Sequence, residues 1–150
     1  MVMDVPTSIT LEFDGYWREP AITGLPEGAG VYCVYACTYN DDDKPKPTVS
    51  ISKLLYIGEG GEVRDRVSGH ELWAEWKEHL APGQVLCFSA ALVSPETTRQ
   101  RAEAALIFWH KPPVNEEYKH SFPFDTTTIS VSGKTTGLTT SFTVKKDSMD

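Results

Sequence analysis

Residues 30–61 read GVYCVYACTYNDDDKPKPTVSISKLLYIGEGG and predict a β-hairpin. Its two arms, residues 31–39 and 49–58, are rich in β-branched and aromatic residues and are bounded by turn residues. The intervening NDDDKPKP is charged and carries two prolines, so it cannot lie inside a sheet and indicates a solvated loop. The arms are therefore expected to pair antiparallel and to bring Tyr32 and Tyr56 onto neighbouring strands. Two such tyrosines are either core packing or two walls of a site.

Helices and further strands are expected on both sides of this hairpin. SITLEF at residues 8–13 alternates polar and apolar side chains and is a candidate N-terminal strand. After the hairpin, residues 62–67 and 71–80 have helix-compatible composition and spacing. QVLCFSAALV, residues 84–93, predicts a third strand of the same apolar, β-branched kind.

Residues 94–113 give the clearest helical pattern in the chain. Ser94 is a favourable N-cap, and Pro95 suits the first helical position, where its missing N–H is tolerated. An apolar stripe follows, made of Ala102, Ala105, Leu106 and Trp109. The proline pair at residues 112–113 ends the helix, because proline cannot continue it.

This order of elements predicts an α+β fold. We expect a small central antiparallel sheet of about three strands flanked by helices, with β extensions at the N and C termini. A chain of 150 residues fits one domain, residues 1–150. The threonine-rich segment within residues 117–150 is a C-terminal extension, either a peripheral hairpin or partly mobile.

Composition and charge restrict the compartment and the partners. The net charge of −7 opposes binding to nucleic acid, but nearly all of this excess lies in residues 1–63, so a local basic face remains open. The three cysteines, Cys33, Cys37 and Cys87, are odd in number and lack CxxC spacing, so neither a disulfide framework nor a zinc site is expected. A cytoplasmic protein follows, and the absence of a long apolar run or signal peptide predicts no membrane association.

Three residues have types and spacings that suit chemistry. Arg66 and His70 are four residues apart and share one face of a helix. An arginine can grip a phosphate with two N–H groups, and a histidine can exchange a proton, but both side chains could equally lie on a solvated surface. Glu103 interrupts an apolar stretch, so it lies either on the outer face of its helix or against a cation.

These residues belong to a larger resemblance. GVY at residues 30–32, YIG at residues 56–58 and Arg66 ten residues after the second tyrosine resemble the GIY-YIG nuclease superfamily. His70 resembles the histidine of its homing-endonuclease and restriction-enzyme branches. EAALI from Glu103, followed by a proline and an asparagine in the segment ending at Asn115, resembles the superfamily block E-x-x-L-I…P-x-x-N. The resemblance covers residues 28–116, the length of the usual catalytic module.

The resemblance implies a divalent-metal-dependent endonuclease that hydrolyses phosphodiester bonds in DNA. Tyr32 and Tyr56 would line the site, and one of them would activate or orient the attacking water. Arg66 would bind the scissile phosphate and stabilise its developing charge. Glu103 would be the single protein ligand of Mg²⁺ or Mn²⁺, which needs only one carboxylate besides water and substrate oxygens.

Supporting roles follow from the same resemblance. His70 would transfer a proton or contact phosphate, Asn115 would hold the site by hydrogen bonds, and Gly58 would let the backbone turn near the site. Glu59 departs from the Lys or Ser common at its position. Its carboxylate would repel phosphate, offer a second metal ligand or mark a site that no longer cuts.

The sequence therefore supports two hypotheses for the function. The first is the endonuclease, and the alternative is a catalytically impaired protein of the GIY-YIG fold that binds nucleic acid or a protein. The chain has no zinc motif or basic arm for binding DNA. Target choice would then come from loops, from the C-terminal extension, from a homo-oligomer or from a protein partner.

Overall fold

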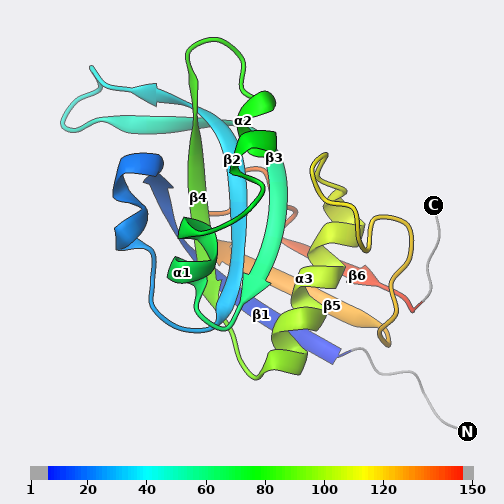
Figure 1. The fold of residues 1–150 in the computed structure, drawn as a ribbon. Helices are drawn as coiled ribbons and strands as arrows, with labels where there is room; N and C mark the ends of the chain where they lie inside the picture. The colour runs from blue at the N-terminus through cyan, green and yellow to red at the C-terminus, as the bar shows by residue number, and fades with distance from the viewer. Residues whose placement is uncertain (1–6, 147–150) are drawn as a thin grey trace, which may run out of the picture.

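A mixed sheet of six strands organises the part of the chain that the structure describes, residues 7–146 of the computed structural model (Figure 1). The strands follow the spatial order β3-β2-β4-β1-β5-β6. They are β1 (Thr7–Arg18), β2 (Gly30–Asn40), β3 (Thr48–Gly60), β4 (Gln84–Leu92), β5 (Thr127–Gly133) and β6 (Ser141–Val144). The helices are the 3-10 helix η1 (Glu19–Gly24) and the α-helices α1 (Val63–Ser68), α2 (Trp73–Glu78) and α3 (Glu96–His110). The two ends of the predicted domain, residues 1–6 and 147–150, lie outside the described residues.

The expectation of a small sheet of about three antiparallel strands flanked by helices is wrong. β1 pairs antiparallel with β4 and parallel with β5, so both terminal extensions belong to one curled, half-barrel-like sheet (Figure 1). The physical reason lies in β1, where Ile9, Leu11 and Phe13 alternate with exposed residues and are buried. These three side chains and those of β5 continue the core beyond β4, which requires the sheet to continue with them.

The predicted hairpin is confirmed, and its register sets the direction of Tyr56. β2 and β3 pair antiparallel, and the ladder is regular from Gly30 to Val34, which lies opposite Tyr56. Two shifts of register occur only beyond this pair, in the half of the hairpin nearer its loop. Directly opposite residues point to one face of a sheet, and so do alternate residues of one strand such as Tyr32 and Val34. Tyr56 therefore packs on the same face of the sheet as Tyr32.

Two apolar clusters cover the two faces of the sheet. Alternate residues of β2 divide between them, with Val31, Cys33 and Tyr35 on one side and Tyr32, Val34 and Ala36 on the other. α3, β1, β5 and β6 contribute to the first cluster. α1, α2 and neighbouring side chains such as Leu25 and Leu86 form the second. The strand β2 is thus buried on both faces, as its continuous apolar run favours.

The helix α3 begins one residue later than predicted. It starts at Glu96, and Pro95 rather than Ser94 takes the N-cap position without a side-chain hydrogen bond. It ends at His110, where Lys111 adopts a left-handed conformation and Pro112 follows. Trp109, expected in the buried stripe, is 46% exposed and stacks on Phe142 of β6.

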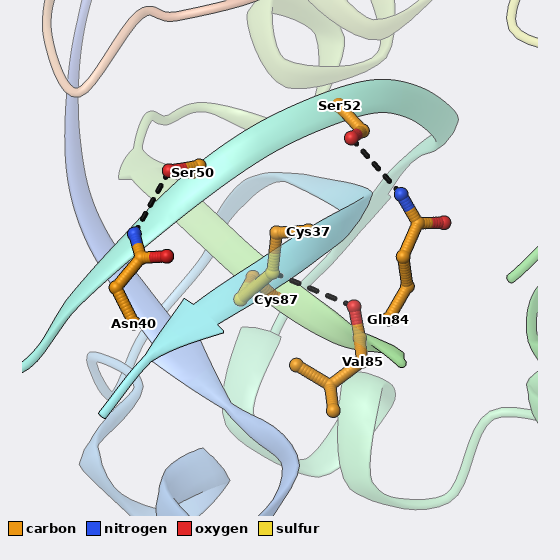
Figure 2. Close-up of a disulfide and its surroundings, with 7 residues drawn as sticks. All are labelled: Cys37, Asn40, Ser50, Ser52, Gln84, Val85 and Cys87. Atoms are coloured by element: carbon orange, nitrogen blue, oxygen red, sulfur yellow. Dashed lines mark hydrogen bonds between the residues drawn. A yellow bond between two sulfur atoms is a disulfide. The ribbon is translucent and has the colours of Figure 1, made fainter. Parts of the chain in front are cut away.

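The expectation that the cysteines form no disulfide is also wrong. Cys37 of β2 and Cys87 of β4 are bonded (Figure 2). Cys33 is the buried free cysteine. The odd count hides this pairing, because a pair and a leftover thiol give the same total as three thiols. Around the disulfide, the side chain of Gln84 donates a hydrogen bond to Ser52 of β3 at 2.9 Å (Figure 2). No helix in residues 7–146 is long and apolar enough to cross a membrane.

Candidate active site

One cavity of about 700 Å³ gathers most of the predicted site residues. Its walls come from β2, β3, the α1–α2 segment, α3 and the loop that follows α3. All the predicted residues except His70 and Gly58 line it: Tyr32, Tyr56, Glu59, Arg66, Glu103 and Asn115. Residues 32 and 115 lie far apart in the chain, so the fold, and no local segment, brings this set together.

The two tyrosines form adjacent parts of the wall, with ring centroids 6.3 Å apart. Tyr32 lies opposite Gly58 in the β2–β3 ladder, and its ring covers that glycine. A Cβ atom on Gly58 would lie 2.3 Å from the Tyr32 hydroxyl oxygen. Gly58 therefore makes room for the Tyr32 ring, which differs from the expected role of turning the backbone.

Both tyrosine hydroxyls remain protonated near neutral pH. Burial is the main cause that raises the pKa of Tyr56 to about 12, and it raises the pKa of Tyr32 further. A phenol in this state can donate one hydrogen bond and accept others. It can therefore orient a water molecule, whereas a phenolate base is disfavoured in this cavity.

Arg66 presents its guanidinium to the cavity and is held by one carboxylate. Its Nη1 donates to Glu71 Oε2 at 2.9 Å, and its Nη2 donates to Glu71 Oε1 at 3.2 Å. The hydrogen bond to Arg66 is the main cause that lowers the pKa of Glu71 to about 2. The pair is fully charged at neutral pH, and both side chains are accessible to solvent.

Glu103 is largely buried and lies close to two other carboxylates, those of Glu59 and Glu117. Burial is the main cause that raises its pKa to about 8, and the negative charges of Glu59 and Glu117 raise it further. Arg66 and Arg99 act in the opposite direction but do not cancel these effects. A bound cation would stabilise the ionised carboxylate of Glu103, which is the property required of a metal ligand.

Glu59, the residue that departs from the GIY-YIG resemblance, has a buried partner. Nε of Arg99 donates to Glu59 Oε2 in a short contact, and Nη2 of Arg99 lies 3.4 Å from Glu96 Oε2. The Arg99 side chain is 8% exposed and the Glu59 side chain 20%. The charge of Glu59 is thus compensated by an arginine of α3, which reduces the repulsion that a free carboxylate would exert on phosphate.

His70 lies behind the tyrosines and does not line the cavity. Its ring contacts Tyr56 and Trp76 at centroid distances of 5.3 and 4.6 Å. Its Nδ1 accepts a hydrogen bond from the backbone N–H of Leu72 at 3.1 Å, which leaves the ring hydrogen on Nε2. Burial first, and the charge of Arg66 second, lower its pKa to about 4. A neutral, buried imidazole suits support of the tyrosine wall better than proton transfer to a substrate.

Asn115 joins the loop after α3 to the edge of the sheet. Its Oδ1 accepts a hydrogen bond from Ile57 N–H, and its Nδ2 donates to Ile57 O, each at 2.9 Å. The backbone N–H of Val114 also donates to Leu55 O at 3.0 Å. These bonds satisfy the outer edge of β3 beside Tyr56 and Gly58, so Asn115 acts on the geometry of the wall.

Sequence reasoning missed several polar residues of the lining. They are Glu71, Glu75, Gln100, Glu116, Glu117 and Tyr118. Gln100 and the buried partner Arg99 were accessible to prediction, because they precede Glu103 by three and four residues on one helix face. The glutamates of the two loops gave no signal, since exposed acidic residues in loops are common.

The donor set suits a hard divalent cation held by few protein ligands. Residues 7–146 contain no group of three or more His, Cys, Asp or Glu side chains that could hold a metal ion. A Mg²⁺ site with one carboxylate does not require such a group, because water and substrate oxygens complete its coordination.

The chain matches no family model, no curated protein and no solved structure.

Proposed function

We propose that this protein is a divalent-metal-dependent endonuclease of the GIY-YIG type that hydrolyses phosphodiester bonds in DNA. The observation that carries the proposal is the meeting of Tyr32, Tyr56, Arg66 and Glu103 in one cavity. Each of these residue types matches one requirement of phosphodiester hydrolysis: orientation of water, binding of phosphate and binding of a cation.

The chemistry divides among these side chains. Arg66 binds the scissile phosphate through its two terminal nitrogens and stabilises negative charge on the phosphoryl oxygens. The Tyr56 hydroxyl, with Tyr32 beside it, orients the attacking water by hydrogen bonds. Glu103 would hold Mg²⁺ or Mn²⁺, and such an ion would supply Lewis-acid stabilisation of the leaving oxygen. His70 and Asn115 support the wall that carries the tyrosines.

The acidic lining favours a bound cation for this reaction. Arg66 is the cation among the described lining residues, against six glutamates at positions 59, 71, 75, 103, 116 and 117, of which Glu59 is already paired with Arg99 of α3. The remaining carboxylates oppose the entry of a polyanion, and a divalent ion on Glu103 would offset part of their charge.

The same lining is the observation that favours the second candidate function. A protein of this resemblance that no longer cuts could use the acidic cavity to bind a protein, or bind nucleic acid elsewhere. Binding without cleavage, retained when Glu103 is replaced, is the result that supports this alternative.

Cleavage of plasmid and branched DNA in the presence of Mg²⁺ or Mn²⁺ tests the proposal. We expect Glu103→Gln and Arg66→Ala each to lower the rate by about 10²-fold or more, because each removes charge stabilisation of the transition state. Glu78→Gln and Arg64→Ala are matched controls, since neither residue lines the cavity, and we expect them to leave cleavage unchanged. Cleavage that survives both Glu103→Gln and Arg66→Ala would refute the assignment.

The partners and compartment stay predictions. DNA is the proposed substrate, and a second copy or a protein partner would supply target choice. The cytoplasmic prediction rested on the expected absence of a disulfide, and the Cys37–Cys87 bond removes that support, because disulfides are rare in reducing compartments.

A further inference from the structure

The two terminal nitrogens of Arg66, which the proposed function assigns to phosphate, already bind the carboxylate of Glu71. Both oxygens of Glu71 accept hydrogen bonds from its terminal nitrogens, at 2.9 and 3.2 Å. Two parallel N–H···O bonds are also the geometry with which a guanidinium binds a phosphate. A phosphate therefore reaches these two nitrogens only after the Glu71 carboxylate has left them.

The backbone holds Glu71 in this position while its side chain remains free to leave. On one side of it, the buried ring of His70 anchors the chain between Tyr56 and Trp76. On the other side, the N–H of Leu72 donates to His70 Nδ1. The Glu71 side chain itself is 66% exposed, so it can rotate into solvent without moving the backbone.

A second glutamate of the same cavity provides a contrast. Glu75 also lines the cavity and is exposed, yet it forms no ion pair within the described residues. Its charge acts on an incoming anion through space, as does that of Glu71. Only Glu71 in addition occupies the donor atoms that the anion needs.

We propose that Glu71 is an internal competitor that determines which anions bind at Arg66. In the absence of ligand its carboxylate occupies the two nitrogens, and a phosphate or phosphodiester enters by displacing it. An anion that engages both N–H groups replaces the lost hydrogen bonds, whereas a spherical anion such as chloride does not. This proposal rests on the role of Arg66 in the proposed function and adds a specificity-determining residue to that site.

The size of the effect follows from the exposure of the pair. Exposed ion pairs contribute little because water and salt screen them, and bidentate geometry places this pair at the upper end of the usual range. Removal of the competitor is expected to strengthen phosphate binding about two- to five-fold. Glu75→Gln removes the same charge from the same cavity and is expected to give a smaller gain.

Titration of the full chain with inorganic phosphate tests the proposal, with chloride adjusted to keep ionic strength constant. NMR signals of the Arg66 side chain report binding directly, and the midpoint is compared for wild type, Glu71→Gln and Glu75→Gln. We expect the midpoint to fall about two- to five-fold for Glu71→Gln and less for Glu75→Gln. With Arg66→Ala, followed by other signals of the cavity, Glu71→Gln should lose its advantage over Glu75→Gln.

The outcomes separate this proposal from the proposed function. Equal midpoints for the two glutamine variants, or no response of Arg66 to phosphate in any variant, would overturn the competitor role even if the protein cleaves DNA. A specific gain with Glu71→Gln in a protein that cleaves no DNA would uphold the competitor role and reject the nuclease. Thermal unfolding of the variants, expected to match wild type, checks that the exposed substitution leaves the fold intact.

Discussion

Two arginine–glutamate pairs border the same cavity and differ mainly in burial. In the Arg99–Glu59 pair the side chains are 8% and 20% exposed, whereas in the Arg66–Glu71 pair they are 39% and 66% exposed. A buried pair cannot open cheaply, because each partner left alone is a charge removed from water. An exposed pair opens at small cost, because water solvates both partners. The difference assigns Arg99–Glu59 to structure and leaves Arg66 available to a ligand.

The largest expected effect comes from breaking the buried pair. Arg99→Met leaves the Glu59 carboxylate without its partner and should lower the free energy of unfolding by about 3 kcal/mol or more. Arg66→Met, the same substitution in the exposed pair, should cost about 1 kcal/mol or less. Chemical denaturation of both variants measures these values. Adding Glu59→Gln to Arg99→Met should recover most of the loss, and a loss unchanged by this second substitution would count against the pairing.

The next effect is a dependence of stability on pH, and it arises from His70, which precedes Glu71 in the chain. The folded pKa of His70 is about 4, below its ordinary value, so the unfolded chain binds more protons between roughly pH 6.5 and 4. Stability contributed by the neutral ring is therefore present above about pH 6.5 and is lost as pH falls toward 4. The loss should amount to about 2–3 kcal/mol.

Denaturation at several pH values detects this loss, and His70→Gln is the comparison. The variant lacks the titrating ring, so its stability should fall less than that of wild type over the same range. Parallel curves for the two proteins would show that another group is responsible.

The smallest effect is the response of the two pairs to salt. Double-mutant cycles give the coupling energy within each pair. We expect a small favourable coupling for Arg66–Glu71 at low salt that disappears at 1 M NaCl, because screening acts strongly on exposed charges. The coupling of Arg99 with Glu59 should change little. An equal fall in both cycles would remove the distinction between the pairs.

The two pairs also mark how far the sequence leads. Local patterns predict β2, β3, β4 and α3, since alternation, turn residues and helical spacing are properties of short segments. The parallel pairing of β1 with β5 joins the two ends of the chain and leaves no local signal. Weak alternation at both ends indicates strands but does not specify their partners.

The site residues likewise fall into a set that the sequence predicts and a set that it does not. The resemblance supplied Tyr32, Tyr56, Arg66 and Glu103, which meet in the cavity. It gave no partner for Glu59 or Arg66, because an ion pair depends on the relative placement of separate elements. Arg99 could have been suggested from its helical spacing to Glu103, whereas Glu71 precedes a short helix in an exposed loop.

The metal site at Glu103 is tested by diffraction from crystals of the full chain grown with Mn²⁺, recorded at an energy where manganese scatters anomalously. We expect an anomalous peak at the Glu103 carboxylate, inside the cavity lined by Tyr32, Tyr56 and Arg66, and its loss in Glu103→Gln. Manganese bound only at other carboxylates, with none at Glu103, would refute the assignment of Glu103 as the metal ligand.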